Sequence, residues 1–293
     1  MRDPRPIPRI AFQGERGAFS EEAAVRLLGE RIVRIPRPTF ESLFSAIRDG
    51  VADCILAPME NSLAGSVHRS YDLLLESGLH ITGEVVLRVA HCLIGCPGSS
   101  FERIRTVESH PVALAQCERF FAAHPHIRRI ATDDTAGSVR AVVQRGSLTR
   151  AAIAGRRAAE AHGGRILRRN LEDHRENYTR FALLIPSLET PRGANKVSLV
   201  MRLGHRPGTL HRVLGLFARR RINLLKIESR PIQGRPWQYH FYLDLCGLPD
   251  DPRLIAALAE LEKCADWVRL LGWYRAASAT PAVRQRVKKG AKG

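Results

Sequence analysis

The sequence predicts an α/β protein followed by a smaller unit of a different type. Up to residue 188, short apolar strands alternate with amphipathic helices, a pattern typical of layered folds with mostly parallel sheets. A segment without periodicity, 189–195 (ETPRGAN), interrupts the pattern and is interpreted as a linker. The elements after it follow the order βαββαβ, which is the ferredoxin-like arrangement. The 293 residues suffice for about two domains of ordinary size.

Capping residues set the expected helix boundaries in the first unit. Ser20 is predicted to cap a helix whose first turn holds Glu21 and Glu22. Thr39 precedes apolar residues at i, i+3, i+4 and i+7, and Pro111 fits the first turn of another helix that runs to about 121. Strands are predicted at 9–13, 54–57 (ending at Pro58), 85–94, 151–154 and 181–185, and further helices at 67–77, 138–144 and 156–161.

The second unit is predicted to span 196–275. Its strands are expected at 196–203, 223–230, 237–245 and 268–274, with helices at 208–220 and 252–264. The residues after it, 276–293, are rich in basic side chains and are expected to be a disordered tail.

Composition places the chain among ordinary globular proteins. Apolar residues make up 44% and charged residues 26%. No apolar run approaches the roughly 20 residues needed to span a bilayer, and the N-terminus lacks the apolar core of a secretory signal. We therefore expect a cytoplasmic protein without a membrane partner. The cysteines form no CxxC pair or zinc-type spacing and are expected to be packed thiols: Cys54, Cys92, Cys96, Cys117, Cys246 and Cys264.

The net charge of +17 raises the possibility of a nucleic-acid partner. The arginines are spread along the whole length, however, and the one basic run is Arg284 to Lys292. Without an aromatic-interleaved basic patch, nucleic-acid binding is disfavoured. The positive field would instead steer a small anionic substrate toward the protein.

Four polar segments in the first unit do not fit core packing. They are 14–20 (GERGAFS), 58–66 (PMENSLAGS), 109–111 (SHP) with Gln116, and 177–181 (NYTRF). Taken singly, the first could be an ordinary turn before a helix, the second a helix cap and the third a histidine packed at a helix start. In the fourth, Arg180 beside a buried strand needs a partner. That partner could be Glu60 or Asp173, or a ligand carboxylate matched to the guanidinium fork.

Taken together, these segments resemble the prephenate dehydratase family. The resemblance is carried by GERGAFSEEAA, APMENSLAGSVHRSYDLL, ESHPVALAQC, AAIAGRRAAEAHGGRIL and NYTRFALL, and later by ESRP. It makes 10–186 similar to the catalytic domain and 196–275 to the regulatory ACT domain. The implied catalytic fold has two lobes of the type II periplasmic-binding-protein kind, with the active site between them. The chain is expected to cross between lobes near 82–84 and 165–170, which gives one lobe of 10–82 with 170–186 and another of 85–165.

The resemblance also implies roles for individual residues. Thr179 would help the substrate hydroxyl leave as water, Arg180 would clamp a carboxylate, and Phe181 would pack the cleft. The further catalytic candidates are Glu60, Asn61, Ser109 and Gln116. The substrate-binding candidates are Gly17, Phe19, Ser20, Ser62, Gly65, Ser66, Thr135 and Ala136. The reaction implied needs no metal or organic cofactor.

The ACT resemblance implies feedback by L-phenylalanine. The effector-binding candidates are Gly208, Thr209, Leu210, Asn223, Glu228, Ser229, Arg230 and Pro231. A helix N-terminus at Gly208 offers N–H donors to an amino-acid carboxylate. Thr209 and His211 depart from the family pattern, which leaves the strength of inhibition open. Paired ACT units imply a homodimer or homotetramer.

The expected reaction converts prephenate into phenylpyruvate, water and CO2. Two alternatives stay open at this stage. One is the same chemistry on arogenate, in which an amino group replaces the side-chain ketone. The other is a non-catalytic amino-acid sensor that combines a binding-protein-like cleft with an ACT domain.

Overall fold

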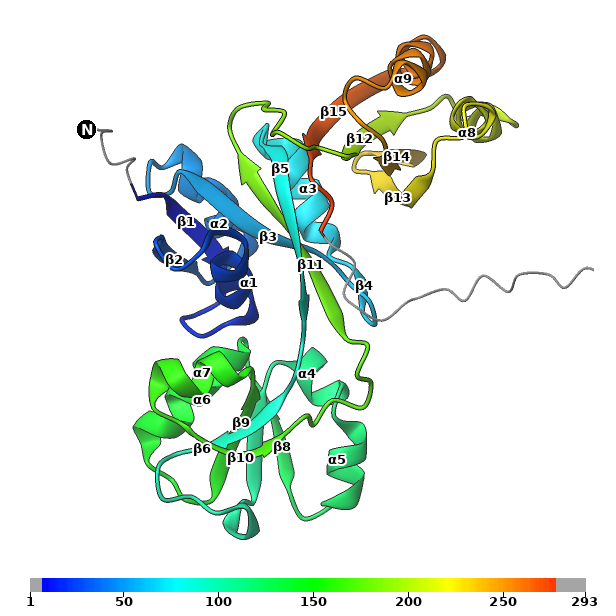
Figure 1. The fold of residues 1–293 in the computed structure, drawn as a ribbon. Helices are drawn as coiled ribbons and strands as arrows, with labels where there is room; N and C mark the ends of the chain where they lie inside the picture. The colour runs from blue at the N-terminus through cyan, green and yellow to red at the C-terminus, as the bar shows by residue number, and fades with distance from the viewer. Residues whose placement is uncertain (1–6, 278–293) are drawn as a thin grey trace, which may run out of the picture.

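The computed structural model describes residues 7–277 and places two lobes and a C-terminal domain in a row (Figure 1). The basic run Arg284 to Lys292 and nearly all of the expected tail lie outside the described residues. The first lobe occupies the middle position, between the C-terminal domain and the second lobe.

The first lobe is built on one mixed sheet. Its strands, in spatial order, are β2 (Val33–Arg37), β1 (Arg9–Gln13), β3 (Cys54–Asn61), β11 (Tyr178–Ile185) and β5 (His80–Arg88), and β4 (Gly65–Ser66) pairs with β3. Helices α1 (Phe19–Leu28), α2 (Phe40–Arg48) and α3 (His68–Ser77) cover it. Strand β11 runs antiparallel to both of its neighbours, so a late part of the chain lies in the middle of an early sheet.

The second lobe is a separate sheet with its own core. Its strand order is β10 (Arg165–Arg169), β6 (Cys92–Gly95), β9 (Arg150–Ala154), β7 (Thr106–Ser109) and β8 (Arg128–Ala131). The helices of this lobe are η1 (Phe101–Arg103), α4 (Pro111–Ala115), α5 (Glu118–Ala123), α6 (Thr135–Arg145) and α7 (Arg156–His162).

The chain passes between the lobes at 89–91 and at 170–177. Both crossings lie further along the chain than the predicted 82–84 and 165–170. Strand β5 pairs with β11 as far as Arg88, which keeps it in the first lobe, and β10 pairs with β6 in the second. The predicted strand 85–94 is therefore divided between two sheets.

Local sequence signals explain most element boundaries. Thr39 forms a capping box with Ser42, and Pro111 occupies the first turn of α4. The prediction for Ser20 was wrong, because Ala18 occupies the N-cap position and Ser20 is buried in the first turn. Strand β3 does not stop at Pro58. Its register to β11 shifts at that point, which accommodates a residue without an N–H.

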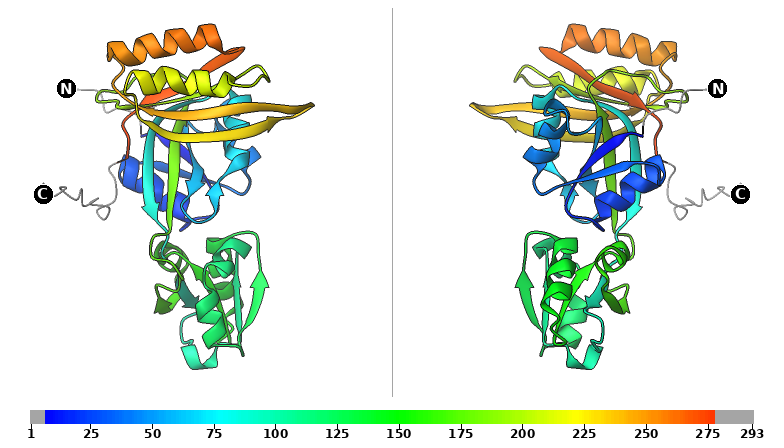
Figure 2. Two further views of the ribbon diagram at one scale, coloured as in Figure 1. Left: turned by 90° about the vertical axis from the view of Figure 1, so that its right-hand side faces the viewer. Right: turned by 90° about the vertical axis from the view of Figure 1, so that its left-hand side faces the viewer.

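The C-terminal domain has the expected βαββαβ order. Its elements are β12 (Lys196–Arg202), α8 (Thr209–Arg219), β13 (Leu224–Ile232), β14 (Arg235–Cys246), α9 (Pro252–Cys264) and β15 (Trp267–Tyr274). The strands form an antiparallel sheet in the order β13-β14-β12-β15. Figure 2 shows both helices on the face of this sheet that points away from the lobes.

The other face of this sheet packs on the first lobe. Tyr242 of β14 meets Tyr71 of α3 edge to face, with ring centroids 4.9 Å apart, and both residues belong to a core shared by the two domains. Strand β15 approaches β5 so closely that a Cβ on Gly272 would lie 2.0 Å from the carbonyl oxygen of Ile81. Only glycine fits this contact, so the two domains meet in one well-defined arrangement.

Two expectations from composition concern membranes and cysteines. Within residues 7–277, no helix is both long and apolar enough to cross a membrane. All six cysteines are unpaired, and Cys54, Cys92, Cys96 and Cys117 are buried as packed thiols are. Cys246 is exposed, which departs from the expectation.

Charged side chains are buried where the two domains meet. Arg180 of β11 contacts Glu84 of β5 at 2.6 Å and Asp244 of β14 at 2.7 Å. Lys196 of β12 contacts the same two carboxylates at 3.0 and 3.4 Å. The guanidinium also donates to the hydroxyl of Tyr274 at 2.8 Å. Burial alone would raise the pKa of Asp244, but Arg180 and Lys196 hold the pKa of this carboxyl below its usual range. We call these five residues the interdomain charge cluster.

Replacing Lys196 by Met should destabilise the protein strongly, because two buried carboxylates would share one cation. We expect a loss of about 3–5 kcal/mol in the free energy of unfolding, measured by urea denaturation. Because the pKa of Asp244 is depressed, the loss should shrink as pH falls through that pKa and the carboxylate is neutralised. Arg253→Met, at the surface ion pair with Asp251, is the control and should change little. Equal losses for both variants would contradict this interpretation.

Candidate active site

A cleft of about 380 Å³ lies between the two lobes. Residues from both lobes and from the first crossing segment line it: Gln13, Ala18, Phe19, Ser20, Phe40, Asn61, Ala64, Val67, Val89, His91, His110, Val112, Ala113, Gln116, Asp133, Asp134, Thr135 and Thr179. The lining combines apolar walls with a few polar groups, which is typical of a small-molecule site.

Helix N-termini are a source of positive potential in this cleft, although the lining also includes Asp133 and Asp134, and the Asp134 carboxylate accepts from the Gly137 N–H of α6. Phe19 and Ser20 belong to the first turn of α1, and Thr135 begins α6. Among the described lining residues there is no Arg or Lys. Backbone N–H groups and the hydroxyls of Ser20 and Thr135 are therefore the groups suited to hold an anionic ligand here.

Thr179 lies at the cleft end of β11, directly opposite Asn61 of β3 in the sheet register. The Asn61 amide Nδ2 donates to Thr179 Oγ1 at 3.0 Å. Among residues 7–277, no acceptor is bonded to the Thr179 hydroxyl hydrogen. This hydroxyl is therefore available to donate to a ligand in the cleft.

Some polar residues of the cleft had no signal in the sequence. His91 follows an apolar strand as a single histidine, and Asp133 and Asp134 sit in a loop before α6. Burial lowers the pKa of His91 and raises the pKa of Asp134. None of them belongs to a motif with a characteristic spacing, so only the fold brings them to the cleft.

Two predicted catalytic residues point away from the cleft. Arg180 belongs to the interdomain charge cluster and cannot clamp a substrate carboxylate in this arrangement. Neighbouring residues of a strand face opposite sides, so Thr179 in the cleft puts Arg180 on the other face. Glu60 likewise faces the C-terminal domain, where its carboxylate contacts Lys226 at 3.0 Å.

Of the remaining catalytic candidates, two line the cleft and two do not. Asn61 and Gln116 line the cleft as expected. Ser109 is fully buried, and its hydroxyl donates to the Ile153 carbonyl at 2.6 Å. Phe181 packs in the core of the first lobe beneath α1 rather than in the cleft.

Three of the substrate-binding candidates, Phe19, Ser20 and Thr135, line the cleft. Ala136 is buried in the core of the second lobe. The others are occupied elsewhere: the Ser62 hydroxyl donates to the Glu176 carbonyl, Gly65 sits in the exposed β3–β4 hairpin, and Ser66 donates to Glu228 of the C-terminal domain.

Gly17 lies where the two lobes touch, and its N–H group is not free to donate to a ligand. Its N–H already donates to the Glu21 carboxylate at 2.5 Å. Its φ is +84°, and a Cβ there would lie 2.6 Å from the Cα of Ala158 in α7. Beside it, Glu15 of the first lobe accepts two bonds of 2.7 Å from Arg140 of α6.

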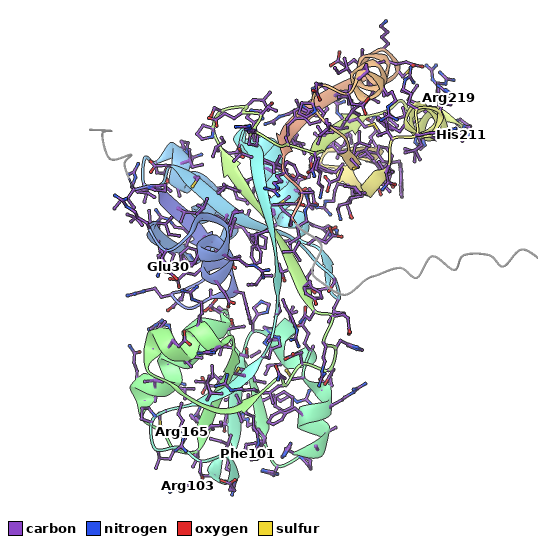
Figure 3. All side chains as sticks on the ribbon, in the orientation of Figure 1. Glu30, Phe101, Arg103, Arg165, His211 and Arg219 are labelled. Atoms are coloured by element: carbon purple, nitrogen blue, oxygen red, sulfur yellow. The ribbon has the colours of Figure 1, made fainter. Side chains whose placement is uncertain are left out.

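A second inter-lobe pair lies further along the same side. Glu30, on the part of the first lobe that faces the second, contacts Arg157 at 3.3 Å (Figure 3). Together with the Glu15–Arg140 pair and the Gly17 contact, it makes the lobes touch beside the cleft. The cleft is therefore bounded by direct lobe-to-lobe contacts.

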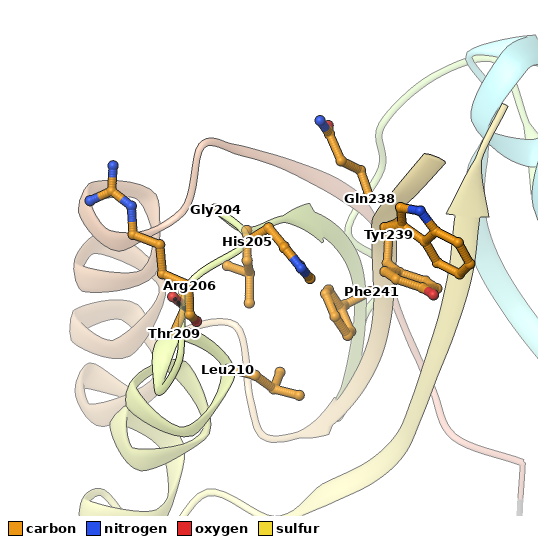
Figure 4. A pocket seen from close by; sticks show the side chains of 10 residues that line it. Gly204, His205, Arg206, Thr209, Leu210, Gln238, Tyr239 and Phe241 are labelled. Carbon is orange, nitrogen blue, oxygen red and sulfur yellow. Dashed lines mark hydrogen bonds between the residues drawn. The ribbon is translucent and has the colours of Figure 1, made fainter. Parts of the chain in front are cut away.

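A second pocket, of about 150 Å³, lies in the C-terminal domain between the start of α8 and strand β14. Figure 4 shows Leu210, His205 and Phe241 directed into a common space. Thr209 and Leu210 line it as predicted, and Gly208 is the left-handed N-cap residue of α8 beside it. His211 lies on the outer side of α8, exposed to solvent (Figure 3).

The other effector-binding candidates do not line this pocket. Glu228 and Arg230 face the first lobe, where Glu228 accepts from Ser66 and Arg230 contacts Asp72 at 2.8 Å. Strand alternation turns Ser229 and Pro231 to the opposite, exposed side. The predicted effector set, Asn223 included, is therefore not assembled around one pocket within a single chain.

These features define a class of two-lobed proteins with a ligand-sized cleft between the lobes and an attached ferredoxin-like domain. A family model for prephenate dehydratase matches residues 10–187, and one for the ACT domain matches 197–263. The chain belongs to the prephenate dehydratase family. This confirms the predicted family and fold class, a type II periplasmic-binding-protein-like catalytic unit with a ferredoxin-like ACT domain.

Relatives that match most of this chain support the assignment. Arogenate dehydratase/prephenate dehydratase 2, chloroplastic, of Arabidopsis thaliana is 40% identical over 278 residues, which cover 91% of this chain and 72% of the relative. The prephenate dehydratase of Arthrobacter aurescens, solved in complex with L-Phe, is 30% identical with a TM-score of 0.83, covering 94% of this chain and 92% of that one. A structure described as a novel type of quorum quenching acylase is 36% identical with a TM-score of 0.84, covering 92% and 98%.

Gly17→Ala should push the lobes apart, because the new methyl group would meet the backbone of α7. We expect a lower thermal midpoint and a larger radius of gyration in small-angle scattering. Gly78→Ala is the matched control: its φ is +73° and nothing lies within 4 Å of the added Cβ, so it carries the backbone strain alone. A scattering profile for Gly17→Ala identical to that of the control would refute this lobe contact.

Proposed function

We propose that this chain converts prephenate into phenylpyruvate, CO2 and water, under feedback by L-phenylalanine at the ACT domain. The observation that carries the proposal is the Thr179 hydroxyl, which faces a cleft lined by helix N-termini and has a hydrogen free to donate. Family membership supports the dehydratase chemistry. That the protein works in the cytoplasm, as a homodimer or homotetramer, is part of the same proposal.

The proposed reaction requires little from the protein beyond orienting the substrate and donating hydrogen bonds to it. Prephenate carries two carboxylates and a hydroxyl on a cyclohexadiene ring. The bond from the ring to its carboxylate breaks to release CO2, its electron pair enters the ring, and the C–O bond opposite breaks as the oxygen takes up a proton. Aromatisation drives both steps. Thr179 donates the hydrogen bond to the departing oxygen, while first-turn N–H groups of α1 and the hydroxyls of Ser20 and Thr135 hold the carboxylates.

The acidity of Thr179 limits its role. A threonine hydroxyl is a far weaker acid than any group that titrates near neutrality. We therefore assign it as an oriented hydrogen-bond donor to the departing oxygen, whose proton comes from solvent water, in a cleft whose apolar walls include Phe40 and Val67. General acid catalysis typically contributes about 10²–10⁴-fold, which sets the scale for its loss.

Arogenate is the second candidate substrate, and two observations favour testing it. Relatives of this chain carry arogenate dehydratase in their names. In addition, Asp133 and Asp134 place carboxylates in the cleft, where they could receive an ammonium group. Comparing kcat/KM for the two substrates decides between them.

Acyl transfer, suggested by the described activity of one similar structure, is less well supported by this cleft. Hydrolysis of an amide by a threonine nucleophile needs an adjacent base. The bonded neighbour of Thr179 Oγ1 is the Asn61 amide, which cannot accept a proton. An N-acyl amide belongs in the assay as a third substrate.

The fold offers a route from the ACT domain to the cleft. Arg180 follows Thr179 directly in β11, and its guanidinium contacts Asp244 and Tyr274 of the C-terminal domain. A shift of that domain on effector binding would act on the strand that carries Thr179. Regulation of this kind requires that phenylalanine bind two arrangements of the protein with different affinity.

Thr179→Val should lower kcat at least tenfold, because valine keeps the shape of threonine without its hydroxyl. KM should change little, since the helix N-termini that hold the carboxylates are untouched. Steady-state kinetics with prephenate, following phenylpyruvate absorbance in alkali, measure both constants. Thr179→Ser is the matched control and should retain most of the activity. Wild-type turnover by Thr179→Val would remove this hydroxyl from the mechanism.

Millimolar L-phenylalanine should raise the thermal midpoint and change the activity of the wild-type protein. A ligand at one hundred times its Kd stabilises by about 2.7 kcal/mol. Leu210→Glu, which places a charge in the ACT pocket, should abolish the shift. Leu248→Glu, at an exposed leucine of the same domain outside the pocket, should keep it. No response of the wild-type protein in either measurement would disprove the regulatory proposal.

A further inference from the structure

A continuous chain of side-chain hydrogen bonds leads from Thr179 into the second lobe. Besides Thr179 Oγ1, Asn61 Nδ2 faces Asn177 Oδ1 at 2.8 Å and the Tyr178 carbonyl oxygen at 3.2 Å. Asn177 Nδ2 lies 2.9 Å from Gln116 Oε1, and His91 Nε2 lies 2.9 Å from the same oxygen. Asn177 is fully buried and His91 is 2% exposed. The sequence analysis assigned no role to either residue, although Asn177 belongs to the polar segment 177–181.

The backbone fixes the direction of this chain at one end. The N–H groups of Leu63 and Ala64 lie 3.0 and 2.9 Å from Asn61 Oδ1. The atom facing them must be the oxygen, so the other end of the Asn61 amide must be the NH2 group. An amide that could otherwise be turned by 180° thus has a single allowed orientation.

The orientation of each further side chain then follows from the side chain before it. The NH2 group of Asn61 requires an oxygen from Asn177, which leaves the NH2 group of Asn177 to face Gln116. Gln116 must therefore present its oxygen, and this oxygen can only accept. His91 Nε2 must consequently carry a hydrogen.

His91 is thereby held in one tautomer. Burial lowers its pKa, which favours the neutral ring. With the hydrogen on Nε2, Nδ1 carries a lone pair, and this buried atom has no hydrogen-bond partner among the described residues. The unpaired Nδ1 shows that the bond from Nε2 to Gln116 determines the tautomer.

The direction of the chain matters for Thr179. Because the NH2 group of Asn61 faces Oγ1 and cannot accept a hydrogen bond, the hydroxyl hydrogen of Thr179 must point elsewhere. In the opposite direction, Asn61 would present an oxygen, and Thr179 would donate to it instead of to a ligand. The polarity set by the amides therefore keeps the hydroxyl hydrogen available to the cleft.

We propose that Asn177 and His91 are positioning residues for the dehydration: they complete a one-way hydrogen-bond chain that presents the Thr179 hydrogen to the substrate. The chain joins both lobes, with Asn61 in the first, Gln116 in the second, and His91 and Asn177 on the two crossing segments. It is complete only when the lobes are in this arrangement. The inference rests on the proposed function, in which Thr179 is the donor to the leaving oxygen.

A pair of variants at His91 separates this role from packing. His91→Gln keeps an N–H donor within reach of Gln116 but removes the ring. His91→Phe keeps a ring against Phe19, whose centroid lies 5.7 Å away, but removes the donor. We expect His91→Gln to keep kcat within about threefold of wild type and His91→Phe to lose at least tenfold, with KM nearly unchanged in both. The opposite order, or equal kcat values, would overturn the proposal.

A second measurement does not depend on activity. Nitrogen-resolved NMR of the imidazole groups in the wild-type protein should show His91 protonated at Nε2 and not at Nδ1, with its signal identified by its absence from His91→Gln. A ring protonated at Nδ1 would disprove the direction of the chain even in an active enzyme. If the wild-type protein turned over neither prephenate nor arogenate, the proposed function would fail, and the tautomer would still test the hydrogen-bond chain.

Discussion

The placement of β11 between β3 and β5 is the constraint on which the rest of the structure depends. This strand belongs to the end of the catalytic unit, yet it completes the sheet begun by the first residues. Because β11 returns the chain to the first sheet, two connecting segments join the second lobe to the first, and the cleft lies between the lobes. The two faces of this strand have different neighbours. Thr179 faces the cleft, and Arg180 faces the buried charges at the contact with the ACT domain.

Much of the fold could be predicted because its boundaries rest on local chemistry. The capping box at Thr39, Pro111 in a first turn, and the helix from Pro252 to Cys264 after Asp251 all follow from short-range hydrogen bonding and fixed dihedral angles. The crossings were misplaced because they depend on how far β5 pairs with β11, a long-range match that the local pattern of 85–94 does not contain.

The site was predicted less completely, for two different reasons. Arg180 was predicted to face the cleft because of its motif. Neighbouring residues of a strand face opposite sides, so Thr179 and Arg180 could not both face the cleft. His91 could not have been found, because its importance lies in a partner that is distant in the sequence. Asn177 belongs to the polar segment 177–181, but its bonds to Asn61 and Gln116 could not be predicted from the sequence. The same holds for Glu228 and Arg230, whose neighbours on β4 and α3 become visible only once the two domains are in contact.

The contact between Gly272 and the Ile81 carbonyl limits how this protein can be rebuilt. A chimaera that carries a foreign ACT domain in place of the native one would need a residue without a side chain at the equivalent point of its last strand. Any larger residue would hold the graft off the enzyme and separate Tyr242 from Tyr71. Exchange of ACT domains would therefore depend less on the length of the linker at 189–195 than on a glycine at the position of Gly272.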